Sequence, residues 1–600
     1  MNNSRKLVIP GVIVLIAVIY LVKLFSIQVI DERYALAATD NVVQRVVEYP
    51  YRGLIYDRNG NLIVYNTPEF DLTVVPKDVN DLDTALFCDI FQITREEFDT
   101  KMEEAKEYSW HKASVFRKQL SNIDLARCQD YLVDFNGFSV LSRTARAYTE
   151  PIMANALGYV SEISRSRLER DTSDYYQQGD YIGQSGLELY YEDVLRGKRG
   201  VKLREKNVHG VDMGPYNDGK LDTPSEPGEN LHTTVDINLQ KYGEELMEGK
   251  SGSIVAIEPA TGEILAIVSG PSYDPNMLTG RNYGKNFQKI SQDTLKPLFN
   301  RPLMAQYRPG SIFKIMQAMV ALQEGVISPT TRIRCNRGII GCHGPHSNED
   351  LVGAIKNSCN PYFYNVMKRV VNREVSPDPY EDTRIGLEKW TEYIESFGLG
   401  SPLGIDLPNE KSGLVPSVAH YDRAYNNRPW KYSNIYSIAI GEGENLVVPL
   451  QMANFAAIMA NRGFYYTPHL VHSIGESGEP LAGFKEKHFT MVDPQHFELA
   501  VEAMAKVVES GTGQYRAKLK DIVVCGKTGT VQNDPLPDHS VFIAFAPREN
   551  PQIALAVYVE DAGQGARAAA SIASLMIEKY LIGETERPYI EEYVKKGEFL

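Results

Sequence analysis

Five strand-like runs, two before and three after a long stretch of helical pattern, limit the folds open to this chain. The first two, 253–257 and 263–268, flank Pro-Ala-Thr-Gly and predict a β-hairpin. The other three lie near the end of the chain: 521–525, 540–546 and 553–559. A closing helix is expected at 566–581. We therefore predict one antiparallel sheet assembled from both ends of a domain, with a largely helical insertion between them.

The composition is that of a multi-domain globular protein. The chain has 600 residues, of which 43% are hydrophobic and 23% are charged, which excludes disordered, collagen-like and polytopic membrane classes. Its 63 basic and 77 acidic side chains give a net charge of −14, and an acidic chain is a poor nucleic-acid binder. Six cysteines are too few for a disulfide scaffold in a chain of this length.

An uncharged segment of sixteen residues, 7–22, follows two basic residues near the N-terminus. It is short for a hydrocarbon core of roughly 30 Å, but snorkelling of Lys23 extends a helix to about residue 30. A cleavable signal peptide is the alternative, because Ala35-Leu-Ala37 resembles a processing site, although the charged spacer before it is too long. We predict an uncleaved anchor at 7–30, with the tail 1–6 in the cytoplasm and the bulk of the chain on the far side of the membrane.

The region after the anchor mixes short alternating runs with charged helical stretches, which is typical of an α+β domain. Around 218–230 the sequence concentrates Gly, Pro, Asp and Ser, the composition of an exposed connection. The predicted organisation is therefore α+β in four parts after the anchor: an extension at 31–222, a linker at 223–232, the sheet-containing domain at 233–585 and a C-terminal tail at 586–600.

The first motif with chemical content is Tyr307-Arg-Pro-Gly-Ser311-Ile-Phe-Lys314. A Pro-Gly pair breaks the preceding chain and apolar residues follow at helical spacing, so a helix should begin here. Three-residue spacing brings the Ser311 hydroxyl and the Lys314 amine to one face, and a lysine kept neutral by burial can take the serine proton. The alternative is an ordinary helix with a solvated lysine, because the pattern is short and Ser109-Trp-His-Lys112 also matches it.

Two further motifs follow in order, Ser358-Cys-Asn360 and Lys527-Thr-Gly-Thr530. The second follows a predicted strand, where Gly529 would admit close approach of a substrate backbone. A cation and two hydroxyls suit a carboxylate ligand, and they come from Lys527, Thr528 and Thr530. The alternative is a strand-to-turn junction without function, which the presence of all three motifs disfavours.

Together, Ser-x-x-Lys, Ser-x-Asn and Lys-Thr-Gly resemble the signature of penicillin-binding transpeptidases and serine β-lactamases. Outside the motifs, 51–60, 183–188 and 233–240 are similar to the N-terminal module and junction of class B penicillin-binding proteins, most of all the penicillin-binding protein 2 group of cell elongation. The resemblance covers most of the chain. It implies a transmembrane helix, a pedestal (dimerisation) domain and a transpeptidase domain built on an antiparallel sheet with helices, without a glycosyltransferase domain.

By this resemblance, Ser311 attacks the D-Ala-D-Ala bond of a peptidoglycan stem peptide and forms an acyl-enzyme, which an amine on a neighbouring stem converts into a cross-link. β-Lactams would acylate Ser311 as mimics of that substrate. The other implied roles are Lys314 as base, Ser358 as proton relay to the leaving D-alanine, Asn360 as holder of the peptide amide, Lys527, Thr528 and Thr530 as the grip on the terminal carboxylate, and the N–H groups of Ser311 and Thr530 as oxyanion hole.

The implied function is D,D-transpeptidation during wall elongation, at the bacterial inner membrane with the bulk of the chain periplasmic. No cofactor is needed for that chemistry, and the implied partners are a polytopic glycan-polymerising glycosyltransferase and elongation scaffold proteins. A division-specific class B transpeptidase shares all three motifs and remains an alternative. A β-lactam receptor, a hydrolytic β-lactamase and an inactive scaffold are further alternatives. The segments 441–445 and 511–513 resemble loops that line the cleft, without enough chemistry to name a role.

A second group of candidate ligands lies between the first two motifs, where Cys335, Cys342, His343, His346 and Cys359 fall within 25 residues. Zinc accepts a tetrahedral Cys₃His site, and the best set is Cys335, Cys342, His346 and Cys359. Relatives of the resembled family place a His at the position of His346, and some hold zinc there. A disulfide between Cys335 and Cys342 is the alternative in an oxidising compartment. We predict a structural zinc.

Overall fold

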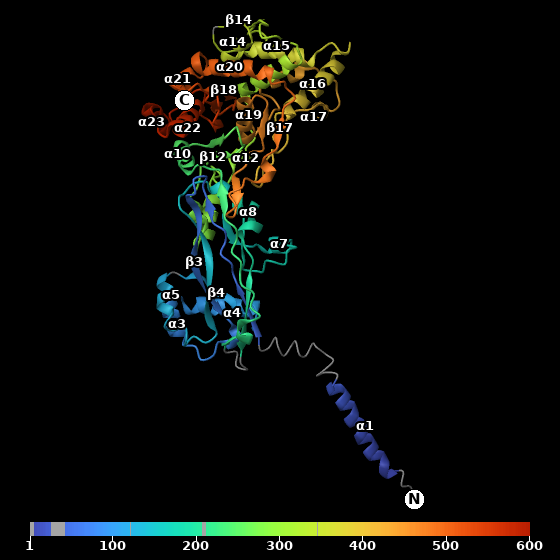
Figure 1. Cartoon of the computed structure of the whole chain (residues 1–600), viewed down its shortest axis with the longest axis vertical. Coiled ribbons are helices and arrows are strands. Elements are labelled where there is room, and N and C mark those ends of the chain that lie inside the picture. Colours follow the sequence, from blue (N-terminus) through green and yellow to red (C-terminus); the bar gives the residue numbers. More distant parts are fainter. Residues whose placement is uncertain (1–4, 26–42, 121, 207–211, 345) are drawn as a thin grey trace. The chain divides into compact units, whose positions relative to one another are not determined.

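The computed structural model describes residues 5–25, 43–120, 122–206, 212–344 and 346–600, and the chain forms two compact units (Figure 1). Unit 1 comprises the described residues of 1–53, 68–144 and 196–228. Unit 2 comprises 54–67, 145–195 and 229–600. The predicted extension, 31–222, is one contiguous range, whereas two of its segments belong to unit 2. Local patterns could not show this, because it depends on pairing between distant parts of the chain.

Unit 1 contains helix α1 and two groups of strands. Strand β1 pairs antiparallel with β8, and β8 with β9, while the later part of β3 pairs antiparallel with β4. Phenylalanines from α3, α4 and β4 form its core. The elements are α1 (Arg5–Phe25), β1 (Val43–Glu48), α3 (Thr84–Phe91), α4 (Arg95–Tyr108), β4 (Ser114–Leu120), α5 (Asn122–Cys128), β8 (Gly200–Lys206) and β9 (Asp212–Pro215), with the later part of β3 (Leu62–Val74) and the earlier part of β5 (Phe138–Tyr148).

The predicted anchor, 7–30, coincides in part with α1, and its residues 26–30 lie outside the described part of the chain. Among the described residues, no helix combines the length and apolarity that crossing a membrane requires.

The central sheet of unit 2 has five antiparallel strands in the order β12-β11-β20-β19-β18. The strands are β11 (Gly252–Ile257), β12 (Ile264–Gly270), β18 (Cys525–Val531), β19 (His539–Ala546) and β20 (Ile553–Val559). Since β11 pairs with both β12 and β20, the prediction of one sheet assembled from both ends is confirmed. The predicted strand at 521–525 was misplaced, because β18 begins at Cys525 and contains the whole Lys-Thr-Gly-Thr motif.

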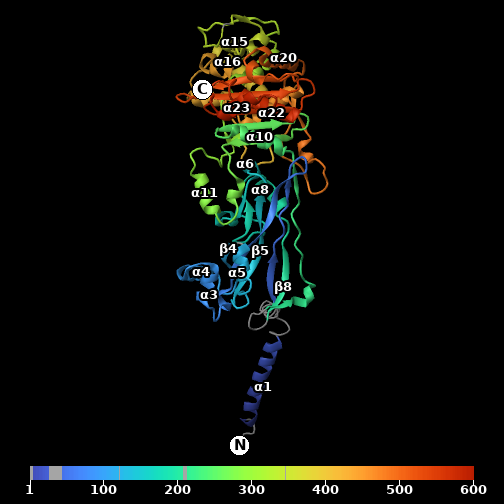
Figure 2. The ribbon, with the colours of Figure 1, turned by 90° about the vertical axis from the view of Figure 1, so that its left-hand side faces the viewer.

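Helices cover both faces of this sheet. Alternate residues of each strand enter two different cores: Ala554, Ala556 and Tyr558 of β20 face one, and Leu555 and Val557 face the other. Helices α10 (Ile237–Met247), α22 (Ala569–Ile582) and α23 (Pro588–Lys596) pack together on one face (Figure 2). Helices α19 (Pro449–Asn461) and α20 (Gln495–Ser510) pack on the other. The predicted tail 586–600 therefore includes a packed helix, α23, whose Ile590 and Val594 are buried one turn apart.

The interval between the hairpin and the last strands is largely helical, as predicted. Its helices are α11 (Tyr283–Ser291), α12 (Arg301–Met304), α13 (Lys314–Gln323), α14 (Leu351–Lys356), α15 (Asn360–Val371), α16 (Pro379–Glu395), α17 (Val418–Ala424), α18 (Tyr432–Ile435), α19, α20 and α21 (Gln514–Ala517). Short strands accompany them: β13 (Ile333–Arg334), β14 (Asn348–Glu349), β15 (Phe464–Tyr466), β16 (Val471–Ile474) and β17 (Lys487–Phe489).

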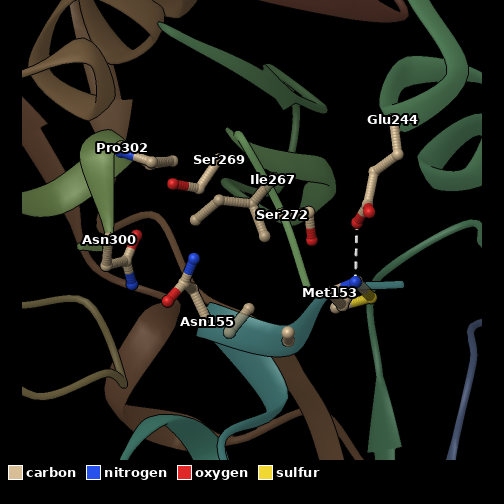
Figure 3. A pocket seen from close by; sticks show the side chains of 10 residues that line it. Met153, Asn155, Glu244, Ile267, Ser269, Ser272, Asn300 and Pro302 are labelled. Carbon is tan, nitrogen blue, oxygen red and sulfur yellow. Dashed lines mark hydrogen bonds between the residues drawn. The ribbon is translucent and has the colours of Figure 1, made fainter. Parts of the chain in front are cut away.

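Two early segments join unit 2 through strand pairing and a partly buried hydrogen bond. Strand β10 (Leu231–Thr233) pairs parallel with β2 (Ile55–Tyr56) and antiparallel with β16. The Glu244 carboxylate of α10 accepts a hydrogen bond of 2.6 Å from the Met153 amide, at one side of a pocket that Asn155 and Asn300 also line (Figure 3). The segments around these contacts contain α6 (Ala154–Leu157), β6 (Val160–Glu162), α7 (Arg165–Leu168), β7 (Tyr181–Gly183), α8 (Gly186–Tyr190) and α9 (Glu192–Leu195).

Candidate active site

Ser311 lies on a short 3-10 turn, η5 (Gly310–Phe313), that leads directly into α13 at Lys314. The turn requires glycine at 310: φ is +57°, and a Cβ there would come within 2.8 Å of the Thr530 carbonyl oxygen. The Gly310 amide also donates to the Gly441 carbonyl at 2.9 Å. The candidate nucleophile is thus held between β18 and the loop that follows residue 440.

The Lys314 side chain is fully buried and its amine is the centre of the site. Nζ lies 3.0 Å from the Ser311 Oγ, 3.1 Å from the Ser358 Oγ and 2.9 Å from the Ser358 carbonyl oxygen. It also donates to the Asn360 Oδ1. One amine therefore joins the first two sequence motifs, which are separated along the chain by the Cys/His segment.

Burial sets the protonation of the two lysines of the site. It lowers the pKa of Lys314 to about 8. Lys527 is also fully buried, and burial together with the positive charge of Lys314 holds its pKa well below the usual value. A lysine with a pKa near 8 is partly neutral at neutral pH, so Lys314 can accept a proton from a hydroxyl.

Ser358 and Asn360 occupy the start of α15. Ser358 has a φ of +55°, a left-handed conformation that costs a non-glycine residue about 1–2 kcal/mol. The backbone turn directs its hydroxyl toward both lysines, since the Lys527 Nζ lies 3.2 Å from the Ser358 Oγ. The Asn360 Nδ2 donates to the Gly341 carbonyl at 2.7 Å, which orients the amide.

The Lys-Thr-Gly-Thr motif runs along β18, paired with β19. The Lys527 ammonium also donates to the Thr528 carbonyl at 2.8 Å, and the Thr530 Oγ1 accepts from the Gly565 amide at 3.2 Å. A Cβ at Gly529 would meet the Ile312 side chain at 3.2 Å, so the glycine lets β18 pack against the nucleophile turn. That Gly529 also admits a substrate backbone stays a prediction.

The sequence assigned no role to two residues that the fold places beside the site. The Thr512 Oγ1 lies 2.7 Å from the Thr528 Oγ1. Glu442 pairs with Arg308 at 3.6 Å, and burial raises its pKa to about 7, against the lowering effect of Arg308. In the sequence, 441–445 and 511–513 resemble loops that line the cleft, but the pattern does not show which side chains Glu442 and Thr512 contact.

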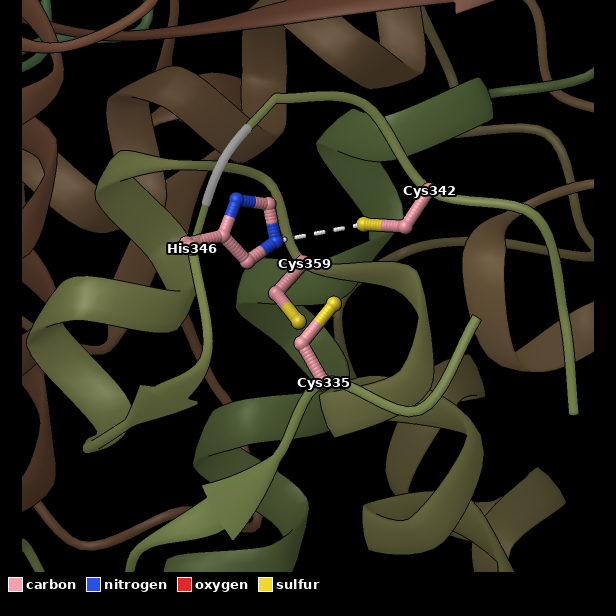
Figure 4. A group of neighbouring side chains, drawn as sticks. All are labelled: Cys335, Cys342, His346 and Cys359. Carbon is pink, nitrogen blue, oxygen red and sulfur yellow. Dashed lines mark hydrogen bonds between the residues drawn. The ribbon is translucent and has the colours of Figure 1, made fainter. Parts of the chain in front are cut away.

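The four predicted metal ligands, Cys335, Cys342, His346 and Cys359, converge (Figure 4). Their donor atoms all lie within 4.8 Å of one another. The Cys342 Sγ lies 3.2 Å from the His346 Nε2 and accepts a hydrogen bond of 3.3 Å from the Asn360 amide. A hydrogen bond from the Cys359 thiol lowers the pKa of Cys342 to about 4, and the same contact raises the pKa of Cys359.

His343 is not part of this cluster, as expected from its position beside Cys342. Cys359 itself separates Ser358 from Asn360, so the thiol cluster and the candidate catalytic side chains share one backbone segment. Whatever fixes the cluster also fixes the start of α15.

Comparison with known proteins agrees with this architecture. Residues 47–233 match the penicillin-binding protein dimerisation domain, and residues 252–578 match the penicillin-binding protein transpeptidase domain. A relative from Acinetobacter baumannii, named peptidoglycan D,D-transpeptidase MrdA, is 30% identical over an alignment of 592 residues that covers 93% of this chain and 84% of the relative.

Two solved structures share the fold. One is the complex between PBP2 and MreC from Helicobacter pylori, with a TM-score of 0.72 and 24% identity over 90% of this chain and 99% of the other. The second is a peptidoglycan synthase complex that coordinates polymerization and crosslinking, with a TM-score of 0.70 and 24% identity over 98% of this chain and all of the other, 100%. With a dimerisation domain, a transpeptidase domain and this relative, the chain belongs to the class B penicillin-binding proteins.

Proposed function

We propose that the chain is a peptidoglycan D,D-transpeptidase of cell-wall elongation that cross-links stem peptides through an acyl-enzyme on Ser311. The observation that carries this proposal is the buried Lys314 amine, which lies within hydrogen-bonding distance of both the Ser311 and the Ser358 hydroxyls. Relatives that bear the name MrdA and the transpeptidase family match favour elongation over the division-specific alternative.

In the acylation step, the Ser311 Oγ attacks the carbonyl carbon of the penultimate D-alanine and its proton passes to the Lys314 Nζ. The oxyanion is held by the backbone N–H groups of Ser311 and Thr530. The C–N bond then breaks, and the proton reaches the nitrogen of the departing D-alanine through the Ser358 hydroxyl. Ser358 suits this relay because its Oγ lies near both lysine amines.

Resolution of the acyl-enzyme reverses this path. The amine of a second stem peptide attacks the ester carbonyl, its proton returns through Ser358 to Lys314, and the Ser311 hydroxyl is regenerated. Asn360 would hold the peptide amide of the donor. Lys527, Thr528 and Thr530 would bind the terminal carboxylate, whose negative charge would favour the protonated form of the buried Lys527.

A structural zinc is part of the proposal. Three thiols and one imidazole within 4.8 Å form a donor set that suits zinc, and one thiol already favours the thiolate. Cys335, Cys342, His346 and Cys359 would hold the ion. Bound zinc would supply no step of the reaction, but it would fix the segment that carries Ser358 and Asn360.

The proposed location rests on the sequence, where 7–22 carries no charge and follows two basic residues. It gives a single-pass inner-membrane protein with a periplasmic bulk. The proposed division is a tail at 1–6, an anchor at 7–30, a pedestal at 31–222, a linker at 223–232, a transpeptidase domain at 233–585 and a C-terminal segment at 586–600. The family matches support the two larger parts of this division.

Partners are proposed from the same relatives. An elongation scaffold protein is supported by the Helicobacter pylori complex of PBP2 with MreC, and a glycan-polymerising glycosyltransferase by the synthase complex. Cross-linking needs nascent strands, and such a polymerase would supply them.

The test is mass spectrometry of the purified protein after exposure to benzylpenicillin, followed by peptide mapping. We expect one stable adduct on Ser311, and transfer of a donor peptide to an added amine in preference to water. An adduct on another residue, or none, would refute the site. Rapid loss of the adduct by hydrolysis would favour the β-lactamase alternative.

A further inference from the structure

One hydroxyl outside the Lys-Thr-Gly-Thr motif contacts a hydroxyl of that motif. It belongs to Thr512, whose Oγ1 lies 2.7 Å from the Thr528 Oγ1. Thr528 is buried, at 7% exposure, whereas Thr512 is exposed. Thr512 therefore sits at the open side of the residue that is proposed to bind the substrate carboxylate.

The loop that carries Thr512 is fixed. It joins α20 to α21, and the amides of Gly511 and Gly513 both donate to the Val507 carbonyl, at 3.2 and 3.0 Å. Gly511 packs so closely on the end of α14 that a Cβ would come within 2.8 Å of the Lys356 carbonyl oxygen. The backbone that carries the Thr512 side chain is thus held by contacts with α20 and α14.

The number of protons that each group can donate determines which hydroxyl is the donor in the Thr512–Thr528 contact when a ligand is bound. Each hydroxyl has one proton to donate, and a carboxylate can only accept. Within the described residues, the two Oγ1 atoms have no hydrogen bond except the one to each other. When Thr528 donates to a carboxylate, Thr512 must be the donor to Thr528.

We propose that Thr512 is a positioning residue of the carboxylate subsite, which aligns the Thr528 hydroxyl for a ligand with a free C-terminal carboxylate. The inference rests on the proposed function and names one further determinant of its specificity. Thr530 has the same arrangement, because its Oγ1 accepts from the Gly565 amide and so keeps its own proton for a ligand. In a Thr512→Val protein, Thr528 would lose its donor and its proton would no longer be directed.

The test compares benzylpenicillin with its methyl ester, which lacks the free carboxylate, on the full chain. Acylation rates are measured by intact mass for the unmodified protein, Thr512→Val and Thr512→Ser. For Thr512→Val we expect acylation by benzylpenicillin to fall about tenfold, the effect of one hydrogen bond to a charged group, and acylation by the ester to change less than about twofold. Thr512→Ser retains the hydroxyl and should restore the rate.

The matched control is Thr330→Val, which removes another exposed threonine hydroxyl that contacts a neighbouring hydroxyl, that of Ser328 at 3.3 Å. This control should leave both rates unchanged, and melting temperatures verify folding. An equal loss with penicillin and with the ester, an unchanged penicillin rate, or no rescue by serine would overturn the inference. A failure of the unmodified protein to be acylated by benzylpenicillin would overturn the proposed function and this inference with it.

Discussion

Ser109-Trp-His-Lys112 in unit 1 and Ser311-Ile-Phe-Lys314 in unit 2 are the same sequence pattern in two different structures. Ser109 ends α4 with an extended backbone, φ −168° and ψ 133°, and its Oγ accepts from the amides of His111 and Lys112. The Lys112 side chain is exposed. At Ser311 the backbone is helical, and the lysine amine reaches the serine hydroxyl at 3.0 Å.

The two segments differ in the backbone conformation that separates the serine from the lysine three residues later. A helical turn brings residues three apart to one face, whereas an extended cap after a helix does not. Burial completes the distinction, because the ammonium of a buried lysine loses solvation and its pKa falls, as it does at Lys314. The Ser109 segment therefore serves as an internal control for each claim about Ser311.

The largest expected effect is the loss of the nucleophile. Ser311→Ala should abolish labelling by benzylpenicillin, since it removes the oxygen that is proposed to attack the ligand. Ser109→Ala should leave labelling intact. Intact-mass spectrometry of both proteins measures this, and undiminished labelling of Ser311→Ala would break the comparison.

Lys314→Met should lower the acylation rate about 10²- to 10⁴-fold, the usual contribution of a general base. The control, Lys112→Met, should leave the rate unchanged. In the unmodified protein the rate should rise with pH through about 8, because burial lowers the pKa of Lys314 to about 8 and only its neutral form accepts a proton. An acylation rate that does not depend on pH between about 6 and 9 would argue against Lys314 as the base.

Lys527→Met should lower acylation by carboxylate-bearing β-lactams about 10- to 100-fold, since a charged hydrogen-bond partner of the ligand is lost. Its melting temperature should not fall. A buried lysine with a lowered pKa costs folding free energy at neutral pH, where the unfolded state binds more protons, so methionine removes that cost. Calorimetry and acylation kinetics on one preparation measure both effects, and a lower melting temperature with unchanged acylation would assign Lys527 a structural role.

The smallest expected effect concerns the metal ligands, which have no counterpart near Ser109. The purified protein should contain about one zinc per chain. Cys359→Ser should lower the zinc content and slow acylation roughly tenfold, because the residues that hold Ser358 and Asn360 in position would be disturbed. Cys128→Ser, a buried cysteine of unit 1, is the matched control and should change neither.

The disulfide alternative for the same cysteines makes the opposite forecast. A bond between Cys335 and Cys342 would survive chelators, give no stoichiometric zinc and add two hydrogens in mass on reduction. Elemental analysis together with intact mass, with and without reductant, separates the two. A metal-free and fully active protein would refute the zinc.

The sequence predicted the parts of the fold that local periodicity controls. The hairpin of β11 and β12, the last two strands and the helical insertion are confirmed, because apolar runs and helical spacing are visible within short windows. The extent of β18 was missed, since Lys-Thr-Gly-Thr has no apolar character, yet Thr528 pairs with Phe542 inside the sheet. Pairing of β2 with β10 was also missed, because only the fold brings these segments together.

In the candidate site, too, the sequence predicted some features, and others depend on the fold. Motif spacing predicted that the Ser311, Ser358 and Lys527 motifs act together. The structure places the Ser311 and Ser358 hydroxyls at the Lys314 amine and the Lys527 amine at the Ser358 hydroxyl. The resemblance placed 511–513 at the cleft, but the contact of Thr512 with Thr528 could not be predicted, because it depends on how the fold brings the two segments together. The left-handed backbone of Ser358 was equally invisible, since serine has no preference for that conformation.

The order of strands in the central sheet also determines when the site can come into existence. Ribosomes make β11, β12 and the Ser311 turn first, while β20, which covers the open edge of β11, and β18, which carries Lys527, are made last. Pairing between such distant segments must wait for the final part of the chain. A nascent chain thus carries its proposed nucleophile before the strand that carries Lys527, so the chemistry cannot start until β18 has been made. Until β20 follows, the edge of β11 is unpaired, and an unpaired strand edge can pair wrongly.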